Sequence, residues 1–174
     1  DNVLRQTTAR LPWLLIGMIG GIGNSMILGN FDSTFAAHPE MALYIPLIGG
    51  TGGNVGTQSS ALVVQGLANS SLDAKNTFKQ VSKEAVVALI NATIISLLVY
   101  TYNFIRFGAT ATVTYSVSIS LFSVVMFASI FGTLVPMTLE KMKIDPAIAT
   151  GPFIAITNDI IGMMMYMGIT VLLS

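Results

Sequence analysis

The chain has 174 residues, of which 53% are hydrophobic and only 9% are charged, and its formal net charge is zero. Soluble domains carry roughly a quarter charged residues, so this composition indicates a membrane protein. The zero net charge argues against a nucleic-acid partner, and the absence of cysteine excludes disulfides and thiolate metal sites.

Five stretches are each long enough to cross a bilayer, which takes about 20 apolar residues per helix. In chain order they are 11–29, 41–69, 82–105, 113–139 and 147–173. The segment ATATVTYSVSIS alternates like a strand, but an open strand edge in lipid would leave backbone groups unpaired, so we predict a helix there too. We therefore expect an all-α membrane protein whose residues 1–174 form a single domain of five transmembrane helices.

Basic residues predict how the chain is oriented. Seven of the eight lie before the first span or in alternate connections: Arg5, Arg10, Lys75, Lys79, Lys83, Lys141 and Lys143. Cytoplasmic loops carry an excess of lysine and arginine, so we expect the N-terminus to be cytoplasmic and the C-terminus to lie outside. An odd number of spans excludes two equal inverted halves within one chain, but a dimer could supply symmetry.

One carboxylate lies deep in a predicted span. Asp159 follows the start of the last span by about twelve residues, or about 18 Å along a helix. The other seven lie in loops or at span ends: Asp1, Asp32, Glu40, Asp73, Glu84, Glu140 and Asp145. A carboxylate in mid-membrane costs about 2.5–3.5 kcal/mol and normally faces a cavity, a partner or an ion.

Three interpretations of Asp159 remain open: a neutral hydrogen-bonded acid, a proton carrier in a coupled transporter, or a cation ligand doubled by a symmetry mate. The neighbouring residues favour the cation ligand. Thr157 and Asn158 add oxygen atoms to the same turn, and small residues such as Gly162 leave room for a hydrated ion.

The second span combines glycines with amides. Its glycines form overlapping small-xxx-small pairs that favour close helix packing, and a stripe of amides suggests a wet pathway. The glycines are Gly49, Gly52, Gly53 and Gly56, and the amides are Asn54, Gln58 and Gln65. The first span repeats the theme with Asn24 among glycines, which we interpret as helix packing. No Walker lysine accompanies the glycines, so we expect no nucleotide site.

Asp145 precedes Pro146, as expected of a helix N-cap followed by proline. An alternative role for Asp145 is an acidic ring that attracts cations to the inner mouth of a pathway.

Three segments of this sequence resemble the membrane domain of the MgtE family of magnesium channels and transporters. They are RLPWLL (10–15), IPLIGGTGGNVGTQSSALVVQGLA (45–68) and KIDPAIATGPFIAITNDIIGMMMYMGI (143–169). The resemblance implies a homodimer with five helices per subunit and an ion path along the two-fold axis, lined by the second and fifth helices.

The resemblance also implies site residues. Asp159 would bind magnesium with its mate, the Ala155 carbonyl would contribute through the ion's water shell, and Asn54 and Asp145 match positions associated with the pathway. We expect five further residues to line the pore: Gly53, Gln58, Thr157, Asn158 and Gly162. The chain departs from the family in having Gly151 where an asparagine is expected, and we expect no cytoplasmic sensor domain within residues 1–174.

These features predict a transporter, and no residue pair resembles an activated nucleophile with its base, so we expect no enzyme activity. The expected function is conduction of hydrated Mg²⁺ across the plasma membrane, driven by the electrochemical gradient. A sodium- or proton-coupled exporter is the alternative, and a membrane scaffold is a third. Mn²⁺, Co²⁺ and Ca²⁺ also accept oxygen ligands.

Overall fold

The structure is a computed structural model that describes residues 2–174, apart from the side chains of Ala74 and Ala149. Its α-helices are α1 (Val3–Gly29), α2 (Asp32–Ala37), α3 (Ile45–Ala68), α4 (Thr77–Phe107), α5 (Thr112–Lys141) and α6 (Pro152–Leu173). Three short 3₁₀ segments are η1 (Pro39–Tyr44), η2 (Ala74–Asn76) and η3 (Pro146–Ala149). No strand occurs in the described part of the chain, which confirms the all-α prediction.

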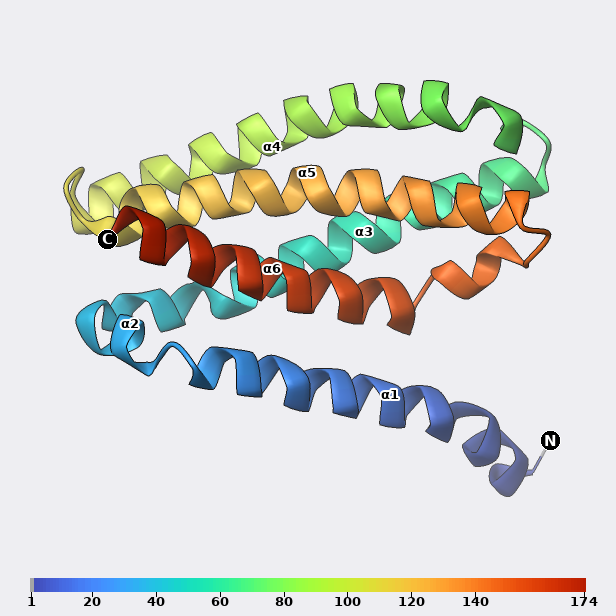
Figure 1. Cartoon of the computed structure of the whole chain (residues 1–174), viewed down its shortest axis with the longest axis horizontal. Helices are drawn as coiled ribbons and strands as arrows, with labels where there is room; N and C mark the ends of the chain where they lie inside the picture. The colour runs from blue at the N-terminus through green and yellow to red at the C-terminus, as the bar shows by residue number, and fades with distance from the viewer. Residues whose placement is uncertain (1) are drawn as a thin grey trace.

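Five long helices form a bundle, with the short α2 at one end (Figure 1). Four of them, namely α1, α4, α5 and α6, are long and apolar enough to cross a membrane. The remaining one, α3, has 24 residues and is therefore about 36 Å long, but its glycines and amides make it less apolar. The length of α3 is thus sufficient for a span, whereas its composition is mixed.

The central helix of the bundle is α5, which packs against α3, α4 and α6. The segment with strand-like alternation lies at its start, and the structure confirms the helix prediction there. The two valines of this segment are buried, and so are four of its hydroxyl residues, because helices pack around this part of α5. The buried hydroxyl residues are Thr114, Ser116, Ser118 and Ser120. Ser96 Oγ donates to the Ser118 carbonyl at 2.7 Å, and Ser116 and Thr170 share a hydrogen bond of 2.6 Å between their hydroxyls. These bonds satisfy polar groups inside the packing.

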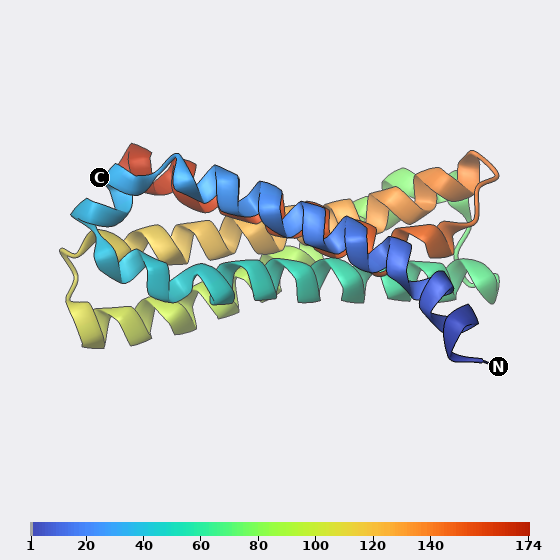
Figure 2. The ribbon, with the colours of Figure 1, turned by 90° about the horizontal axis from the view of Figure 1, so that it is seen from below.

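The outermost helix is α1, which packs on α6, and the two views agree that these helices lie side by side (Figures 1 and 2). Asn24 is buried in this contact. Many large apolar side chains of α1 stay exposed in the single chain, among them Leu14 and Met26. This helix therefore presents much of its surface to lipid or to another subunit.

The structure divides the predicted last span into two parts. Residues 146–149 form η3, and α6 begins at Pro152, part-way along the bundle (Figure 1). Gly151 has φ = 92°, which favours glycine, and the residue before a proline is disfavoured in the α conformation. Asp145 caps η3 by accepting a hydrogen bond from the Ala147 N–H at 3.0 Å, which confirms the capping prediction.

The predicted second span is likewise divided, into η1 and α3. Two tyrosines tie η1 to the bundle. The Tyr44 hydroxyl donates to Asn103 Oδ1 on α4, and the Tyr166 hydroxyl of α6 donates to the Met41 carbonyl at 2.7 Å. These buried bonds fix the start of α3 relative to both α4 and α6.

Replacing Gly132 by alanine is expected to destabilise the bundle. A Cβ at this position would lie 2.6 Å from the Gly56 carbonyl oxygen and 3.2 Å from Ser59 Cβ, so α3 and α5 would have to separate. Overpacking of this kind costs about 1–3 kcal/mol, and the thermal midpoint in detergent should fall accordingly. Gly168→Ala is the matched control, because a Cβ there meets nothing within 4 Å. Equal midpoints for the two variants would contradict the packing described.

Candidate functional site

A groove of about 400 Å³ lies between α3 and α6. Its lining residues are Gly49, Gly50, Gly53, Asn54, Thr57, Ala155, Ile156 and Asp159. The α3 residues share one face because they recur at intervals of three and four, and so do those of α6. Glycine backbone, an amide, a hydroxyl and one carboxylate thus meet in a single concave site.

The Asp159 carboxylate lies directly against the backbone of α3. A Cβ at Gly49 would overlap Asp159 Oδ1, so the carboxylate occupies the space that any other residue would fill. The second oxygen, Oδ2, accepts a hydrogen bond from Asn24 Nδ2 of α1 at 3.2 Å. Two helices therefore hold the acid in place, while the groove gives access to it.

Asp159 is the one carboxylate among the residues that line this groove. Within the described residues, no three acidic, histidine or cysteine side chains come together as a metal cluster. The acid lies seven residues after the start of α6, or about 10 Å along the helix. The described residues therefore place a single negative charge in this groove.

Sequence reasoning missed the contact made by Asn24. The signal was present as an amide deep in an apolar helix, and we interpreted it as a packing residue. The structure shows that Asn24 packs in the α1–α6 contact and also orients the acid. Only the tertiary pairing of residues 135 positions apart reveals this second role.

The structure brings four of the predicted site residues together in the groove, namely Asp159, Ala155, Asn54 and Gly53. Asp145 instead lies exposed at the start of η3, where it forms the cap. Gln58 lines a different cavity, on another face of α3. The predicted amide stripe of α3 is therefore split between two sites.

The other predicted pore residues do not line the groove. Asn158 is 1% exposed and fits against Gly56, where a Cβ would overlap its amide nitrogen. Gly162 is buried, and a Cβ there would contact Val124 and Ile48. Thr157 is part-buried and also lies outside the groove lining. In this single chain, Asn158 and Gly162 serve helix packing.

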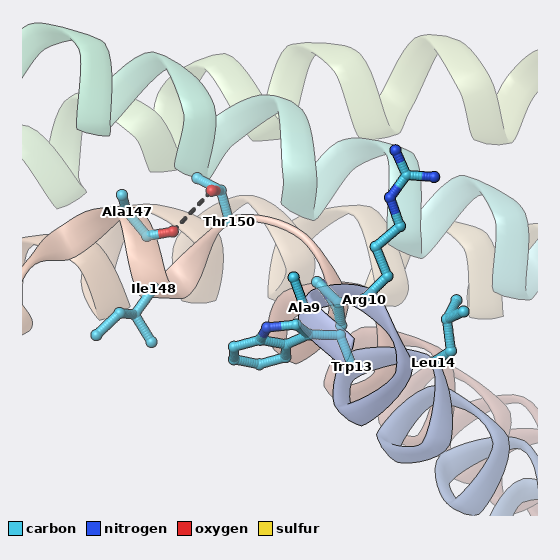
Figure 3. Close-up of a pocket in the computed structure, with 8 residues that line it drawn as sticks. Ala9, Arg10, Trp13, Leu14, Ala147, Ile148 and Thr150 are labelled. Atoms are coloured by element: carbon cyan, nitrogen blue, oxygen red, sulfur yellow. Dashed lines mark hydrogen bonds between the residues drawn. The ribbon is translucent and has the colours of Figure 1, made fainter. Parts of the chain in front are cut away.

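A second groove, of about 560 Å³, lies between the first half of α1 and the η3 region. Figure 3 shows Arg10 and Trp13 of α1 across from Ala147, Ile148 and Thr150. Most of its surface is apolar, its charged group is a guanidinium, and no carboxylate lines it. These side chains are unsuited to ligating a cation.

Comparison with known proteins identifies the family of this chain. Residues 45–169 match the model of the MgtE family, described as a divalent cation transporter. The chain belongs to the MgtE family. The matched region covers all of α3 and α6 up to residue 169, and the resemblance seen in the sequence is confirmed.

Relatives of this MgtE-family chain are named magnesium transporters. It is 32% identical over 160 residues to "Magnesium transporter MgtE" of Bacillus subtilis (strain 168), covering 92% of this chain and 35% of that protein. The protein of the same name from Thermus thermophilus is 32% identical over 165 residues, covering 95% and 36%. That from Enterococcus faecalis is 28% identical over 172 residues, covering 97% and 37%. The chain thus spans about a third of the length of these relatives.

Family membership and the apolar helices together identify an integral, multi-pass membrane protein. The MgtE relationship also agrees with the chemistry of the groove, since a carboxylate with neighbouring oxygen atoms suits hard divalent cations.

Replacing Gly49 by alanine is expected to reduce divalent cation uptake by proteoliposomes. The new Cβ would displace the Asp159 carboxylate, and the loss of about 1.4 kcal/mol of ion stabilisation would lower uptake about tenfold. Gly17→Ala serves as the control, because a Cβ on that part of α1 meets nothing within 4 Å. Unaltered uptake by the Gly49 variant would show that the position of the Asp159 carboxylate against α3 is not needed for transport.

Proposed function

We propose that two copies of this chain form a channel that conducts hydrated Mg²⁺ across the plasma membrane. In this proposal all five long helices span the membrane, and the two Asp159 carboxylates face each other across the two-fold axis. The observation that carries the proposal is the Asp159 carboxylate itself, held by Gly49 and Asn24 at the edge of a groove.

Charge balance supports the dimer. One carboxylate in each groove leaves a divalent ion half neutralised, whereas a symmetry mate would supply the second negative charge. Burying an unbalanced charge in the low-dielectric membrane is costly, so the pair is the favourable arrangement. A partner over the groove would also shield the glycine-rich face of α3 from lipid, which explains how a less apolar helix can span.

The polar groups of the groove suit an ion that keeps its waters. Mg²⁺ dehydrates reluctantly and requires octahedral oxygen geometry, so stripping its whole hydration shell would be expensive. The Ala155 carbonyl lies one helical turn before Asp159, and the Asn54 amide lies in the same groove. A backbone carbonyl in a helix keeps a second lone pair, which can accept a hydrogen bond from an ion-bound water.

The gradient supplies the driving force. A negative interior favours inward movement by about 2.3 kcal/mol per charge per 100 mV, so no ATP is required. With the N-terminus inside, the exposed Asp145 would lie at the cytoplasmic mouth and attract cations there. The names of the relatives favour magnesium as the main cargo, although Mn²⁺, Co²⁺ and Ca²⁺ share its preference for oxygen.

Asp159→Asn is expected to abolish most Mg²⁺ uptake by proteoliposomes while leaving the dimer intact. The amide keeps the size of the side chain but removes both negative charges from the paired site. Uptake would be followed with a magnesium-sensitive dye, and assembly by cross-linking in the membrane. Glu140→Gln is the control, since Glu140 is exposed near the end of α5 and should be dispensable. Full uptake by the Asp159 variant would refute the site.

Hexaamminecobalt(III) is expected to inhibit uptake in competition with Mg²⁺. This complex resembles a hydrated cation but does not exchange its ligands, so it can bind only where the outer shell is recognised. Binding of the complex itself should be lost in the Asp159→Asn variant. A lack of competition in the unmodified protein would indicate direct coordination of the metal instead.

A further inference from the structure

A second polar cavity, of about 310 Å³, lies where α3, α4 and α5 meet. Its polar lining consists of Gln58 and Ser59 from α3, Glu84 and Asn91 from α4, and Ser129 from α5. The α3 residues of this cavity lie on nearly the opposite side of the helix from Gly53 and Asn54, which line the Asp159 groove. The two sites are therefore separate.

Glu84 is the charged group of this cavity. It lies about 10 Å from the start of α4, and its partner Ser59 lies about 14 Å from the end of α3, so the pair is set well inside the bundle. Ser59 Oγ donates to Glu84 Oε1 at 2.9 Å. No basic side chain of the described residues forms an ion pair with Glu84, so its charge has no partner there.

Ser129 provides an independent indication of a ligand. Its side chain is only 3% exposed, it lines the cavity, and it makes no hydrogen bond with any other described residue. Because this hydroxyl faces the cavity and is not bonded within the protein, it can bond to a ligand held there. The amides of Gln58 and Asn91 line the same space and bring the number of neutral side-chain oxygen donors to four, with Ser59 and Ser129.

We propose that this cavity binds a monovalent cation such as Na⁺, held by the Glu84 carboxylate and the neutral oxygens around it. One positive charge balances the single carboxylate, whereas a divalent ion would leave an excess charge in apolar surroundings. Protonation of Glu84 would remove the charge but would supply no ligand to the Ser129 hydroxyl, which faces the cavity. A bound cation would balance the Glu84 charge, accept the Ser129 oxygen as a ligand and link three helices, one of which is α3, the helix that also lines the Asp159 groove.

The test is equilibrium binding of ²²Na⁺ to the purified full chain, measured by scintillation proximity with choline as the replacement cation. We expect Glu84→Gln to weaken binding by about tenfold or more, because the amide carries no charge. Ser129→Ala should weaken it about threefold, the effect of one hydrogen-bonding oxygen. Ser123→Ala is the matched control on α5, since its hydroxyl bonds to the Ile119 carbonyl at 3.0 Å and lies outside the cavity lining.

Asp159→Asn separates this proposal from the proposed channel function. That variant should bind ²²Na⁺ as the unmodified chain does, whatever the outcome of the magnesium experiments. If size-exclusion chromatography shows that Glu84→Gln is misfolded, the comparison of Ser129→Ala with Ser123→Ala still tests the proposal.

Three outcomes would overturn the proposal. Absence of ²²Na⁺ binding by the unmodified chain would indicate a protonated Glu84. Equal binding by the Ser129 and Ser123 variants would place the ion elsewhere. Displacement of ²²Na⁺ from the Asp159→Asn variant by micromolar Mg²⁺ would assign the cavity to a divalent ion.

Discussion

A carboxylate inside a membrane needs a fixed position and a compensating charge, and the arrangement of α1, α3 and α6 follows from that need at Asp159. Gly49 lets the carboxylate rest on the α3 backbone, and Asn24 binds its other oxygen from α1. Apart from Asn24, α1 buries little of its surface where it packs on α6. No second negative charge lines the groove, and in the proposed dimer the symmetry mate would supply it.

The glycines of α3 have distinct physical roles, although they form one pattern in the sequence. Gly49 accommodates Asp159, and a Cβ at Gly52 would lie 2.9 Å from Val124 Cγ1. Gly56 accommodates the buried amide of Asn158. A Cβ at Gly53 would have no atom within 4 Å, because Gly53 lines the groove. Close packing and an accessible backbone are thus obtained on neighbouring faces of the same helix, and the two polar sites lie on either side of it.

Much of the fold could be predicted because it depends on local properties. The long apolar runs predicted five helical stretches, the strand-like alternation before residue 120 was correctly assigned to a helix, and Asp145 caps the turn expected of it. Of the site, Asp159, Ala155, Asn54 and Gly53 were predicted and meet in one groove. The start of α6 at Pro152 was not predicted, because the break depends on the left-handed backbone of Gly151, which apolar composition does not reveal.

The sequence by itself determined that this chain is helical, is embedded in the membrane and carries Asp159 deep in a span, because hydropathy, charge and turn chemistry act over a few neighbouring residues. It placed Glu84 at the end of a span, whereas the structure sets Glu84 seven residues into α4. The tertiary structure decided which polar groups meet. It separated Gln58 from Asn54, placed Asn158 in the packing, brought Asn24 to Asp159, and set Glu84 against Ser59. These pairings depend on the rotation of each helix about its own axis, and that rotation is fixed by side chains far apart in the sequence.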